Sequence, residues 1–469
     1  MKSSGVKKAI FANWGIAVVL LCSLLSRLTG YLYHLAIWWD SAVYIGIGKY
    51  LFSFGKIGLF ENFRPIVLPL MLGSAWKLGL NPIITGLALA LIFSIGAIYL
   101  CYLIGRELFG KNTAIIAAIL LSFTHLFFIY NYRILTEIPS IFFALLAIYL
   151  FLKRRLFWAG LLAGLSLLTR FPEGLIIVSL GLAIVFIQKK QLFSSIIKQG
   201  LVLGAGFLVV VAPYLAFNYI RYGNPILPLI LGDIVIKQAN AWMYPGTYLF
   251  YLINLFKENF LLIFAIAGIA FMFKQKKTRQ LLPILFPLLL LFAYFTYLPH
   301  KELRFTLIFL PYLCLLSAYG IMSCIGFIKS KKYRTLSFVV LFVVLGALAI
   351  YNTQYVNFDE PRTQSEYFGG YVQQNGITGP VMSTNPMLSA YTDNEIIYLA
   401  DWAYADAIYN ESVNDSELLL IDSCDFPCAP EDKACWKLQN DFMKKVLEEN
   451  KIVINMTAGS CQRYILSHS

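Results

Sequence analysis

Carboxylates beside the ends of apolar segments are the residues of this chain whose types and positions could do chemistry. Among the first 351 residues, every acidic side chain except Glu107 is expected to face the same side of a membrane. These seven residues are Asp40, Glu61, Glu137, Glu173, Asp233, Glu258 and Glu302. A carboxylate close to hydrocarbon costs free energy, so it is rarely kept without a partner or a function. Their crowding on one side predicts a polar reaction chamber at one membrane surface.

The first of these carboxylates, Asp40, lies in a stretch from residue 31 to residue 80 that is too long for a simple turn. The aromatic pair Trp38-Trp39 beside it is typical of a helix at a membrane interface, with the carboxylate directed to polar space. Prolines in Arg64-Pro65-Ile-Val-Leu-Pro69 end one helix and start the next. Because aspartate also favours the N-cap of a helix, a capping role is the alternative. We expect a catalytic role for Asp40.

A second cluster lies in residues 299–305, which read Pro-His-Lys-Glu-Leu-Arg-Phe. This segment places four ionisable groups in five positions: His300, Lys301, Glu302 and Arg304. The alternative is a solvated loop whose long side chains reach out of the membrane. Such a loop would need neither charges of both signs nor a histidine. We therefore expect a substrate-binding role.

A third cluster, Thr169-Arg170-Phe-Pro-Glu173, is expected at the tip of a hairpin, where Arg170 could pair with Glu173. Glu137, by contrast, is expected at the start of a helix, where the helix dipole favours an acid, so a structural role is preferred for it.

His34 and His125 are isolated and are interpreted as packing or interface residues. Because histidines and carboxylates show no paired spacing, no metal site and no other cofactor is predicted.

Composition indicates a polytopic helical membrane protein. The chain has 469 residues, of which 59% are hydrophobic and 13% charged, whereas a soluble protein carries roughly a quarter charged residues. The net charge of +13 combines two opposite regions. From residue 352 onward there are 7 basic and 17 acidic residues, a net charge of −10, which leaves 31 basic and 8 acidic residues before it. The basic residues lie in short loops between apolar segments, as the positive-inside rule predicts, and such separated clusters argue against a nucleic-acid partner.

The basic clusters, which include Lys7-Lys8, Lys189-Lys190 and Lys274 to Arg279, orient the chain when they are placed in the cytoplasm. Eleven spans are then predicted, at residues 9–30, 81–104, 113–131, 137–152, 156–170, 174–188, 197–218, 249–273, 280–298, 304–326 and 335–351. The N-terminus is expected inside and the C-terminal region outside. The first span is interpreted as a membrane anchor and not as a cleaved signal peptide, because no small-residue cleavage site follows it.

The C-terminal region has the features of a small extracytoplasmic domain. Three sequons make Asn410, Asn414 and Asn455 candidates for N-glycosylation. Its cysteines favour disulfides over a zinc site, with the pairing left open: Cys424, Cys428, Cys435 and Cys461. Strands are predicted at 380–383, 395–399, 418–422, 451–455 and 463–466, with a helix at 431–450, so we expect an α/β domain.

Particular motifs resemble a known family. The segment His300-Lys301-Glu302-Leu303-Arg304-Phe305 resembles the HKE-x-RF motif of glycosyltransferase family 22, which holds mannosyltransferases of lipid-linked oligosaccharides and GPI anchors. The Trp-Asp40 loop, residues 169–174 and the layout of spans resemble the wider GT-C superfamily. The resemblance covers the membrane region and implies an all-α polytopic domain at residues 1–351. It covers the C-terminal region only loosely, and residues 352–469 are expected from their own patterns to form the small extracytoplasmic α/β domain.

The resemblance also implies an activity. Members of the superfamily carry an acid in the first outer loop and transfer sugars from polyprenyl phosphates such as dolichyl phosphate. We expect a hexosyltransferase, with mannose favoured and a glycan, protein or lipid as acceptor, in the cell membrane or, in a eukaryote, the endoplasmic reticulum membrane. No sizeable cytoplasmic domain is available to hold a sugar nucleotide, which agrees with a lipid-linked donor.

The chemistry of such a donor assigns expected roles. A phosphate leaves without needing a proton, so one carboxylate base is sufficient, unlike the carboxyl pair of glycoside hydrolases. Asp40 would deprotonate the acceptor hydroxyl, with inversion at the anomeric carbon. Glu302 is the second candidate at the catalytic site, where it would orient Lys301 or the acceptor. The leaving phosphate would be held by Arg64, Arg133, Arg170, His300, Lys301 and Arg304.

A transporter or flippase for polyprenyl-linked substrates is the alternative, because it too would have many spans and outward polar groups. Transporters usually place ionisable groups near the bilayer midplane and often contain a repeated half. This sequence shows no convincing repeat, and its acids lie at the ends of spans. A receptor or assembly subunit that uses the acidic C-terminal region is a further alternative.

Overall fold

The structure is a computed structural model that describes residues 3–187, 193–238, 241–275, 278–354, 356 and 363–468. The predicted cytoplasmic pair Lys189-Lys190 lies outside the described residues, as do the side chains of Lys7-Lys8. The chain forms two compact units. The first contains Met1–Tyr33 and Leu87–Phe358, and the second contains His34–Gly86 and Asp359–Ser469.

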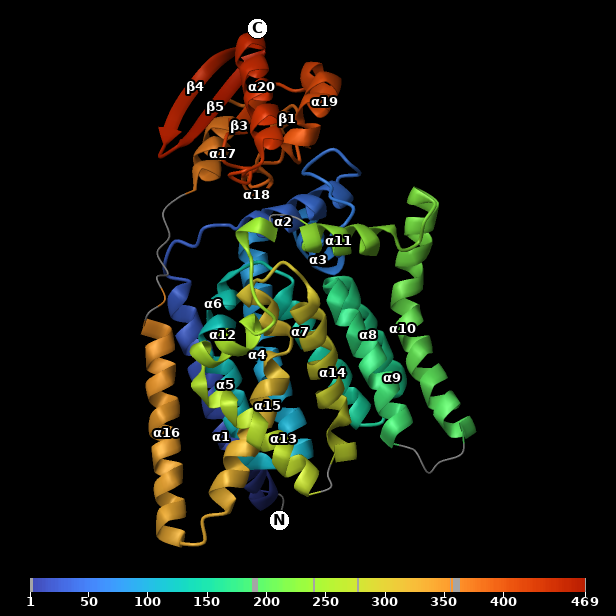
Figure 1. Ribbon diagram of the computed structural model, residues 1–469, viewed down its shortest axis with the longest axis vertical. Coiled ribbons are helices and arrows are strands. Elements are labelled where there is room, and N and C mark those ends of the chain that lie inside the picture. Colours follow the sequence, from blue (N-terminus) through green and yellow to red (C-terminus); the bar gives the residue numbers. More distant parts are fainter. Residues whose placement is uncertain are drawn as a thin grey trace. The chain divides into compact units, whose positions relative to one another are not determined.

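The first unit is built from helices throughout its described residues, and Figure 1 shows its long helices running roughly side by side. Its α-helices are α1 (Ser3–Gly30), α4 (Pro82–Phe109, which begins in the second unit), α5 (Lys111–Phe123), α6 (His125–Ile129), α7 (Glu137–Leu152), α8 (Leu156–Thr169), α9 (Leu175–Ile187), α10 (Phe193–Tyr222), α11 (Leu227–Gln238), α12 (Phe250–Glu258), α13 (Phe264–Lys274), α14 (Thr278–Tyr297), α15 (Leu310–Gly326) and α16 (Lys331–Gln354). Short 3-10 helices are η1 (Tyr130–Tyr132), η2 (Phe171–Gly174), η3 (Ala241–Met243), η4 (Phe260–Ile263) and η5 (Leu303–Ile308).

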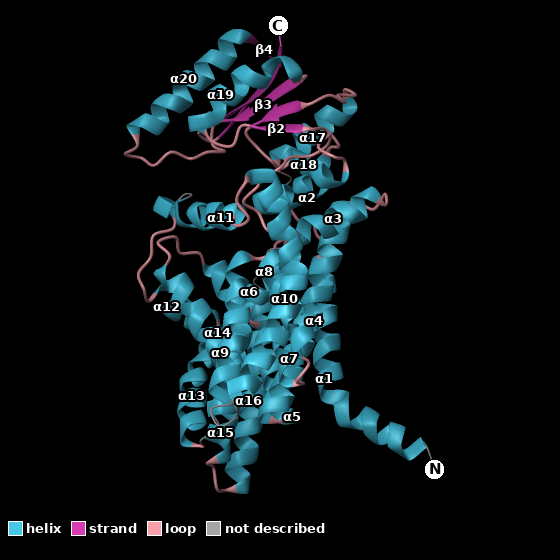
Figure 2. Cartoon of the chain, turned by 90° about the vertical axis from the view of Figure 1, so that its right-hand side faces the viewer, coloured by secondary structure: helices cyan, strands magenta, loops and turns pink. Residues whose placement is uncertain are grey.

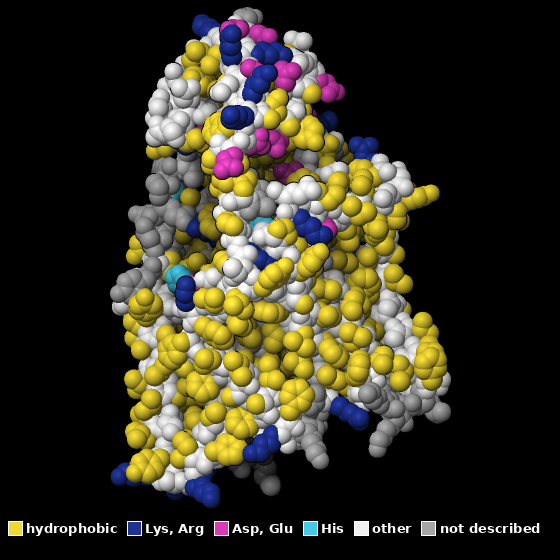
Figure 3. All heavy atoms as spheres, in the orientation of Figure 1, with side chains coloured by type: hydrophobic (Ala, Val, Ile, Leu, Met, Phe, Trp, Pro, Cys, Tyr) yellow, Lys and Arg dark blue, Asp and Glu magenta, His cyan; other side chains and the backbone are white. Residues whose placement is uncertain are grey.

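These helices have the apolar character of membrane spans. Among the described residues, three are long and apolar enough to cross a membrane alone: α4, α10 and α16. A fourth candidate is the pair Lys111–Phe123 and His125–Tyr132, which is bent by 65°. Each predicted span overlaps an apolar helix or a pair of helices, so the expected polytopic helical fold is confirmed, while the number of eleven crossings stays a prediction. Figure 3 shows hydrophobic side chains covering one face of this unit.

Close helix contacts in the first unit depend on small residues. A Cβ atom added to Gly160 of α8 would lie 1.9 Å from the carbonyl oxygen of Leu203 on α10, and one added to Gly206 would lie 1.9 Å from the oxygen of Phe157. Such distances are far shorter than van der Waals contact, so α8 and α10 approach backbone to backbone. This kind of packing joins helices in membranes, where lipid removes the usual hydrophobic drive.

The second unit is an α/β domain. Its helices are α2 (Trp39–Phe52), α3 (Val67–Lys77), α17 (Gln364–Gln374), α18 (Leu388–Tyr391), α19 (Trp402–Ser412), α20 (Lys433–Glu449) and the 3-10 helix η6 (Val413–Asp415). Its strands are β1 (Val381–Ser383), β2 (Ile396–Tyr398), β3 (Leu418–Asp422), β4 (Asn450–Ala458) and β5 (Cys461–His468). They form one sheet in the order β2-β1-β3-β5-β4, in which β1 is parallel to β2 and β3, and β5 is antiparallel to β3 and β4.

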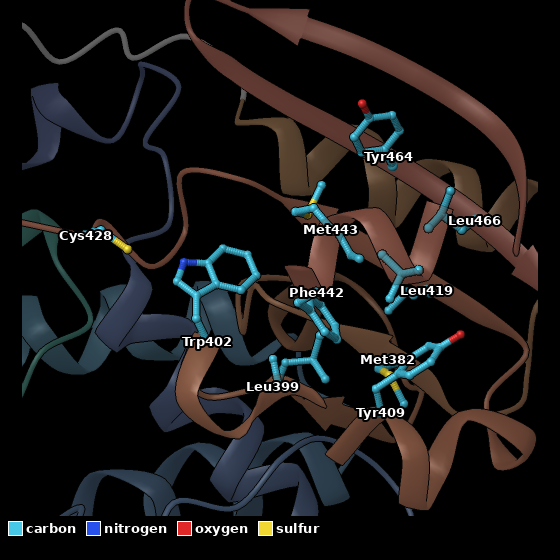
Figure 4. Close-up of a cluster of buried hydrophobic side chains, with 13 residues drawn as sticks. Met382, Leu399, Trp402, Tyr409, Leu419, Cys428, Phe442, Met443, Tyr464 and Leu466 are labelled. Carbon is cyan, nitrogen blue, oxygen red and sulfur yellow. The ribbon is translucent and has the colours of Figure 1, made fainter. Parts of the chain in front are cut away.

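Both faces of this sheet are covered by helices. On one face, α19 and α20 contribute Trp402, Tyr409 and Phe442 to a core with Leu419 and other strand residues, and Figure 4 shows these side chains packed together. The helices α19 and α20 lie on the same side of the strands in Figure 2. On the other face, α2, α17 and α18 pack on Val381, Leu418, Leu420 and Ile465.

Helix α2 therefore belongs to the core of the C-terminal domain. Lys49 of α2 is buried, and its ammonium donates to the carbonyl oxygen of Thr392 at 2.8 Å and pairs with Asp393 at 2.9 Å. Gly58 extends the sheet, because it bridges in parallel to Glu395 beside β2. The predicted division at residue 352 assigned residues 34–86 to the membrane domain, whereas the structure groups them with the C-terminal residues, since these contacts and the shared core join them.

The five strands and the helix expected in the C-terminal region are present, each within a few residues of its predicted bounds. The small C-terminal sheet domain is thus confirmed. The cysteines form two disulfides, Cys424–Cys461 and Cys428–Cys435. Asn410, Asn414 and Asn455 are all exposed, which is the condition that glycosylation of these residues requires.

Candidate active site

Asp40 stands in the first turn of α2, with Trp38 as the N-cap residue and no capping hydrogen bond from the Trp38 side chain. Arg64, in the loop before α3, places Nη1 at 2.9 Å from Oδ1 of Asp40. The same guanidinium places Nε at 2.7 Å from Oε2 of Glu61. Asp40 and Arg64 each keep 19% of the side chain exposed. Asp40 is accordingly held in an ion pair and remains partly exposed.

Aromatic rings surround this cluster. The guanidinium of Arg64 lies over the ring of Phe63 at 5.2 Å and over that of Tyr44 at 5.8 Å. Trp39, next to Asp40, packs edge-on against Tyr398 of β2 and against Phe426 at ring-centroid distances of 6.3 Å. Burial alone would lower the pKa of Arg64, but the carboxylates of Asp40 and Glu61 raise it well above its ordinary value. Arg64 is therefore cationic near physiological pH.

The first unit contains a separate charged network, which is centred on Glu137 at the start of α7. Its carboxylate is buried and lies 3.0 Å from Nη1 of Arg170 and 4.0 Å from Nε of Arg304. Arg170, between α8 and η2, also donates from Nη1 to the hydroxyl of Thr136 at 3.1 Å. Both guanidinium groups lie over the ring of Phe305 at 5.5 Å. Two arginines from distant parts of the sequence thus converge on one carboxylate.

Glu302 continues this network toward His300. Its Oε1 accepts hydrogen bonds from Nε2 of His300 at 2.6 Å and from Nη2 of Arg304 at 3.0 Å, while Oε2 lies 2.6 Å from Nε of Arg304. Burial alone would raise the pKa of Glu302, but the hydrogen bond from His300 and the charge of Arg304 outweigh it and lower the pKa. The ring of His300 stacks on Tyr244 at 4.7 Å. Glu302 is consequently an ionised carboxylate that orients His300 and Arg304.

The side chain of Lys301 does not contact the carboxylates of this network and binds the end of α14 instead. Its ammonium donates to the carbonyl oxygens of Phe295 and Thr296 in the last turn of α14, at 3.1 and 2.5 Å. It also lies 5.5 Å from the centre of the Tyr251 ring. A lysine that binds the terminal carbonyls of a helix stabilises the end of that helix. The geometry therefore favours a structural role for Lys301 over the expected contact with a phosphate.

Arg133 follows η1 and lies within electrostatic reach of Tyr130, as do Glu137, Glu302 and Arg304. Glu173 is fully buried in η2 and accepts a hydrogen bond from Ser140 of α7 at 3.4 Å. Among the described residues, the ion-pair partner of Arg170 is Glu137 and not Glu173.

The structure thus brings the predicted residues together in two groups. Arg170, His300, Glu302 and Arg304 form one network in the first unit, while Asp40 and Arg64 form an ion pair in the second. Glu137 joins the first network although the helix-start pattern favoured a structural role for it. Its one signal in the sequence was the cost of burying an acid near hydrocarbon, which requires a partner. Glu61, which the sequence placed outward without a role, joins the second group.

Metal-ligating side chains gather at one place among the described residues, where Asp422, Cys424 and Cys461 come together. Both cysteines are joined in a disulfide, so their sulfur atoms are not thiolate ligands. This group is accordingly part of the disulfide framework of the second unit.

Comparisons with known proteins show which sequences and folds this chain is similar to. Residues 64–217 match the model of a family described as dolichyl-phosphate-mannose-protein mannosyltransferase. The fold is similar to that of ArnT from Cupriavidus metallidurans bound to undecaprenyl phosphate, with a TM-score of 0.66 and 13% identity over 97% of this chain and 98% of that one. It is also similar to the oligosaccharyltransferase AglB from Archaeoglobus fulgidus, solved with an inhibitory peptide and a dolichol-phosphate, with a TM-score of 0.57 and 15% identity over 98% and 75% of the two chains.

A third similar structure is the mycobacterial arabinofuranosyltransferase AftD, with a TM-score of 0.53 and 11% identity over 97% of this chain and 41% of that one. A search of curated proteins found no match. At these identities the structures establish the fold. Together with the match over residues 64–217, they show that this chain has the fold of these membrane glycosyltransferases.

Proposed function

We propose that this protein transfers a hexose, with mannose favoured, from a polyprenyl phosphate to an acceptor hydroxyl on the extracytoplasmic side of the membrane. The description of the matched family, which names dolichyl-phosphate-mannose and protein, supports mannose as the sugar and protein as one acceptor. Glycan and lipid acceptors stay within the proposal. The alternative of a transporter is not favoured, because the matched family and the similar structures reported above are glycosyltransferases.

Asp40 is the base in this proposal. Its carboxylate takes the proton of the acceptor hydroxyl while the hydroxyl oxygen attacks the anomeric carbon of the donor. The bond between that carbon and the phosphate oxygen breaks, and its electron pair leaves with the polyprenyl phosphate. The anomeric carbon is inverted. The observation that carries this assignment is the placement of Asp40, which is partly exposed and held by Arg64 at 2.9 Å.

Arg170 and Arg304 hold the leaving phosphate in this proposal, with Arg133 and His300 beside them. Arginine matches the geometry of phosphate oxygens through paired N–H donors. One observation supports a phosphate at this network: Arg170 and Arg304 converge on the buried Glu137 carboxylate, at 3.0 and 4.0 Å, so two guanidinium groups lie close together.

The test is transfer from a radiolabelled polyprenyl-phospho-mannose by the purified full chain. Asp40→Asn keeps the shape of the side chain and removes the base, so we expect donor binding to persist while transfer falls by about a hundredfold or more. The matched control is Glu448→Gln, which removes one carboxylate from an exposed ion pair of α20 in the same unit. Undiminished turnover in Asp40→Asn removes Asp40 from the mechanism.

The same assay identifies the sugar and the acceptor class. Donors that carry mannose, glucose or arabinose on the same polyprenyl phosphate are offered in turn, each with peptide, glycan and lipid acceptors. We expect consumption of the mannose donor. Consumption of another sugar with no activity on mannose would correct the donor and leave the class of enzyme intact.

A further inference from the structure

Arg64 is shared between two carboxylates of the second unit. Its Nη1 lies 2.9 Å from Asp40 and its Nε lies 2.7 Å from Glu61. The Glu61 side chain is only 8% exposed, compared with 19% for Asp40. The three residues therefore form a chain in which the accessible carboxylate is at one end and the buried one at the other.

This arrangement bears directly on the strength of the proposed base. A guanidinium beside a carboxylate favours the ionised form and weakens its affinity for a proton, whereas a second carboxylate nearby has the opposite effect. Arg64 is cationic near physiological pH, so its attraction for Asp40 persists there. The negative charge of Glu61 offsets part of the positive potential that Arg64 produces at Asp40. Glu61 therefore favours proton uptake by Asp40.

Other titratable groups of the second unit surround this chain. Tyr44 of α2 lies against Arg64, and Tyr398 of β2 is within electrostatic reach of Glu61 and Arg64. Tyr398 is also within reach of Asp401 and Asp425. The tyrosines are neutral near physiological pH. Among the described residues of this unit, Glu61 shares the guanidinium of Arg64 with Asp40.

We propose that Glu61 is a positioning residue that holds Arg64 and thereby keeps Asp40 basic enough to take the proton of the acceptor. This inference rests on the proposed function of Asp40 as the base. Glu61 itself touches neither donor nor acceptor. It acts on the reaction through Arg64, by fixing where the guanidinium lies and by sharing its charge.

Glu61→Gln tests this proposal, because glutamine keeps the size of the side chain and removes its charge. The acidic limb of the pH profile of kcat/KM reports the base of the free enzyme. In Glu61→Gln, no negative charge offsets the effect of Arg64 on Asp40, so the pKa of the base decreases. We expect the limb to move to lower pH by about one pH unit, and kcat on the plateau to fall by roughly three- to tenfold because the base is weaker.

Two control variants separate charge from structure. Glu61→Asp retains the carboxylate and should keep the limb at its wild-type position. Glu448→Gln removes a carboxylate from an exposed pair in the same unit and should leave the limb and kcat unchanged. A limb that stays in place in Glu61→Gln, or that moves equally in Glu61→Asp, overturns the proposal.

Failure of this inference is distinguishable from failure of the proposed function. If Asp40→Asn abolishes transfer and the limb of Glu61→Gln is unshifted, Asp40 remains the base and Glu61 has no part in tuning it. If Asp40→Asn retains full turnover, the base lies elsewhere, and the inference about Glu61 is overturned with the mechanism.

Discussion

Two residues that are close in sequence, Lys301 and Arg304, have different surroundings. Arg304 faces the carboxylates of Glu302 and Glu137, whereas Lys301 binds carbonyl oxygens at the end of α14. The motif is therefore not one uniform cationic surface. Its arginine contributes charge to the network, and its lysine anchors the loop on which that network stands.

Arg304→Ala and Lys301→Ala are expected to differ in kind. Loss of a hydrogen bond to a charged group costs about 1.5–3 kcal/mol, so Arg304→Ala should weaken donor binding by roughly tenfold or more. Lys301→Ala should instead lower thermal stability, with a smaller effect on the KM for the donor. Donor titration and thermal unfolding of both variants in detergent provide the measurement. Equal donor affinity in the wild type and Arg304→Ala would return Arg304 to a structural role.

Sequence patterns identified the charged residues of the candidate site better than they identified the ion-pair partner of each residue. The acids and bases of the 300–304 segment were recognised because unusual charge at the end of an apolar span is visible locally. The pairing of Arg170 with Glu137 was not, because 33 positions separate them and a closer acid, Glu173, was available. Which carboxylate an arginine meets depends on how α7 and α8 pack, and no local pattern contains that information.

At the scale of elements, the contact between α8 and α10 rests on glycine. Gly206 lies where any side chain would meet the backbone of Phe157, whereas Gly204 on the same helix has open space at the corresponding position. Alanine is favoured over glycine inside a helix by about 1 kcal/mol. The same substitution should therefore destabilise the protein at Gly206 but not at Gly204.

Gly206→Ala should separate α8 from α10 and lower the temperature of unfolding, while Gly204→Ala should leave it unchanged or raise it slightly. Thermal unfolding of the two variants in the same detergent measures this difference. Because the helical preference is identical at both positions, a drop in Gly206→Ala alone isolates the packing. An equal response would show that the close approach contributes nothing to stability.

Strands of the C-terminal domain were predicted well because short runs of β-branched and aromatic residues between turn signals are a local property. The membership of α2 in that domain was not predictable in the same way. It depends on contacts such as Lys49 with Thr392, which are 343 residues apart. Nothing in the sequence around Lys49 indicates that its partner is Thr392.

At the scale of the whole molecule, topology determines on which side the chemistry takes place. Our proposal puts the C-terminal residues outside the cytoplasm, and the three sequon asparagines are exposed. Expression in a glycosylating eukaryotic cell should give a mobility shift that N-glycan removal abolishes. Replacing Asn410, Asn414 and Asn455 with glutamine should abolish the same shift. Glycans at other positions, or a C-terminal region cleaved by protease from the cytoplasmic side, would contradict this orientation.

The central claim is that Arg170 and Arg304 hold the phosphate of a polyprenyl-phosphate donor. An experimental structure of the full chain with a bound polyprenyl phosphate tests it most directly. We predict phosphate oxygens within hydrogen-bond distance of Arg170 and Arg304. A phosphate bound away from both arginines would contradict the account.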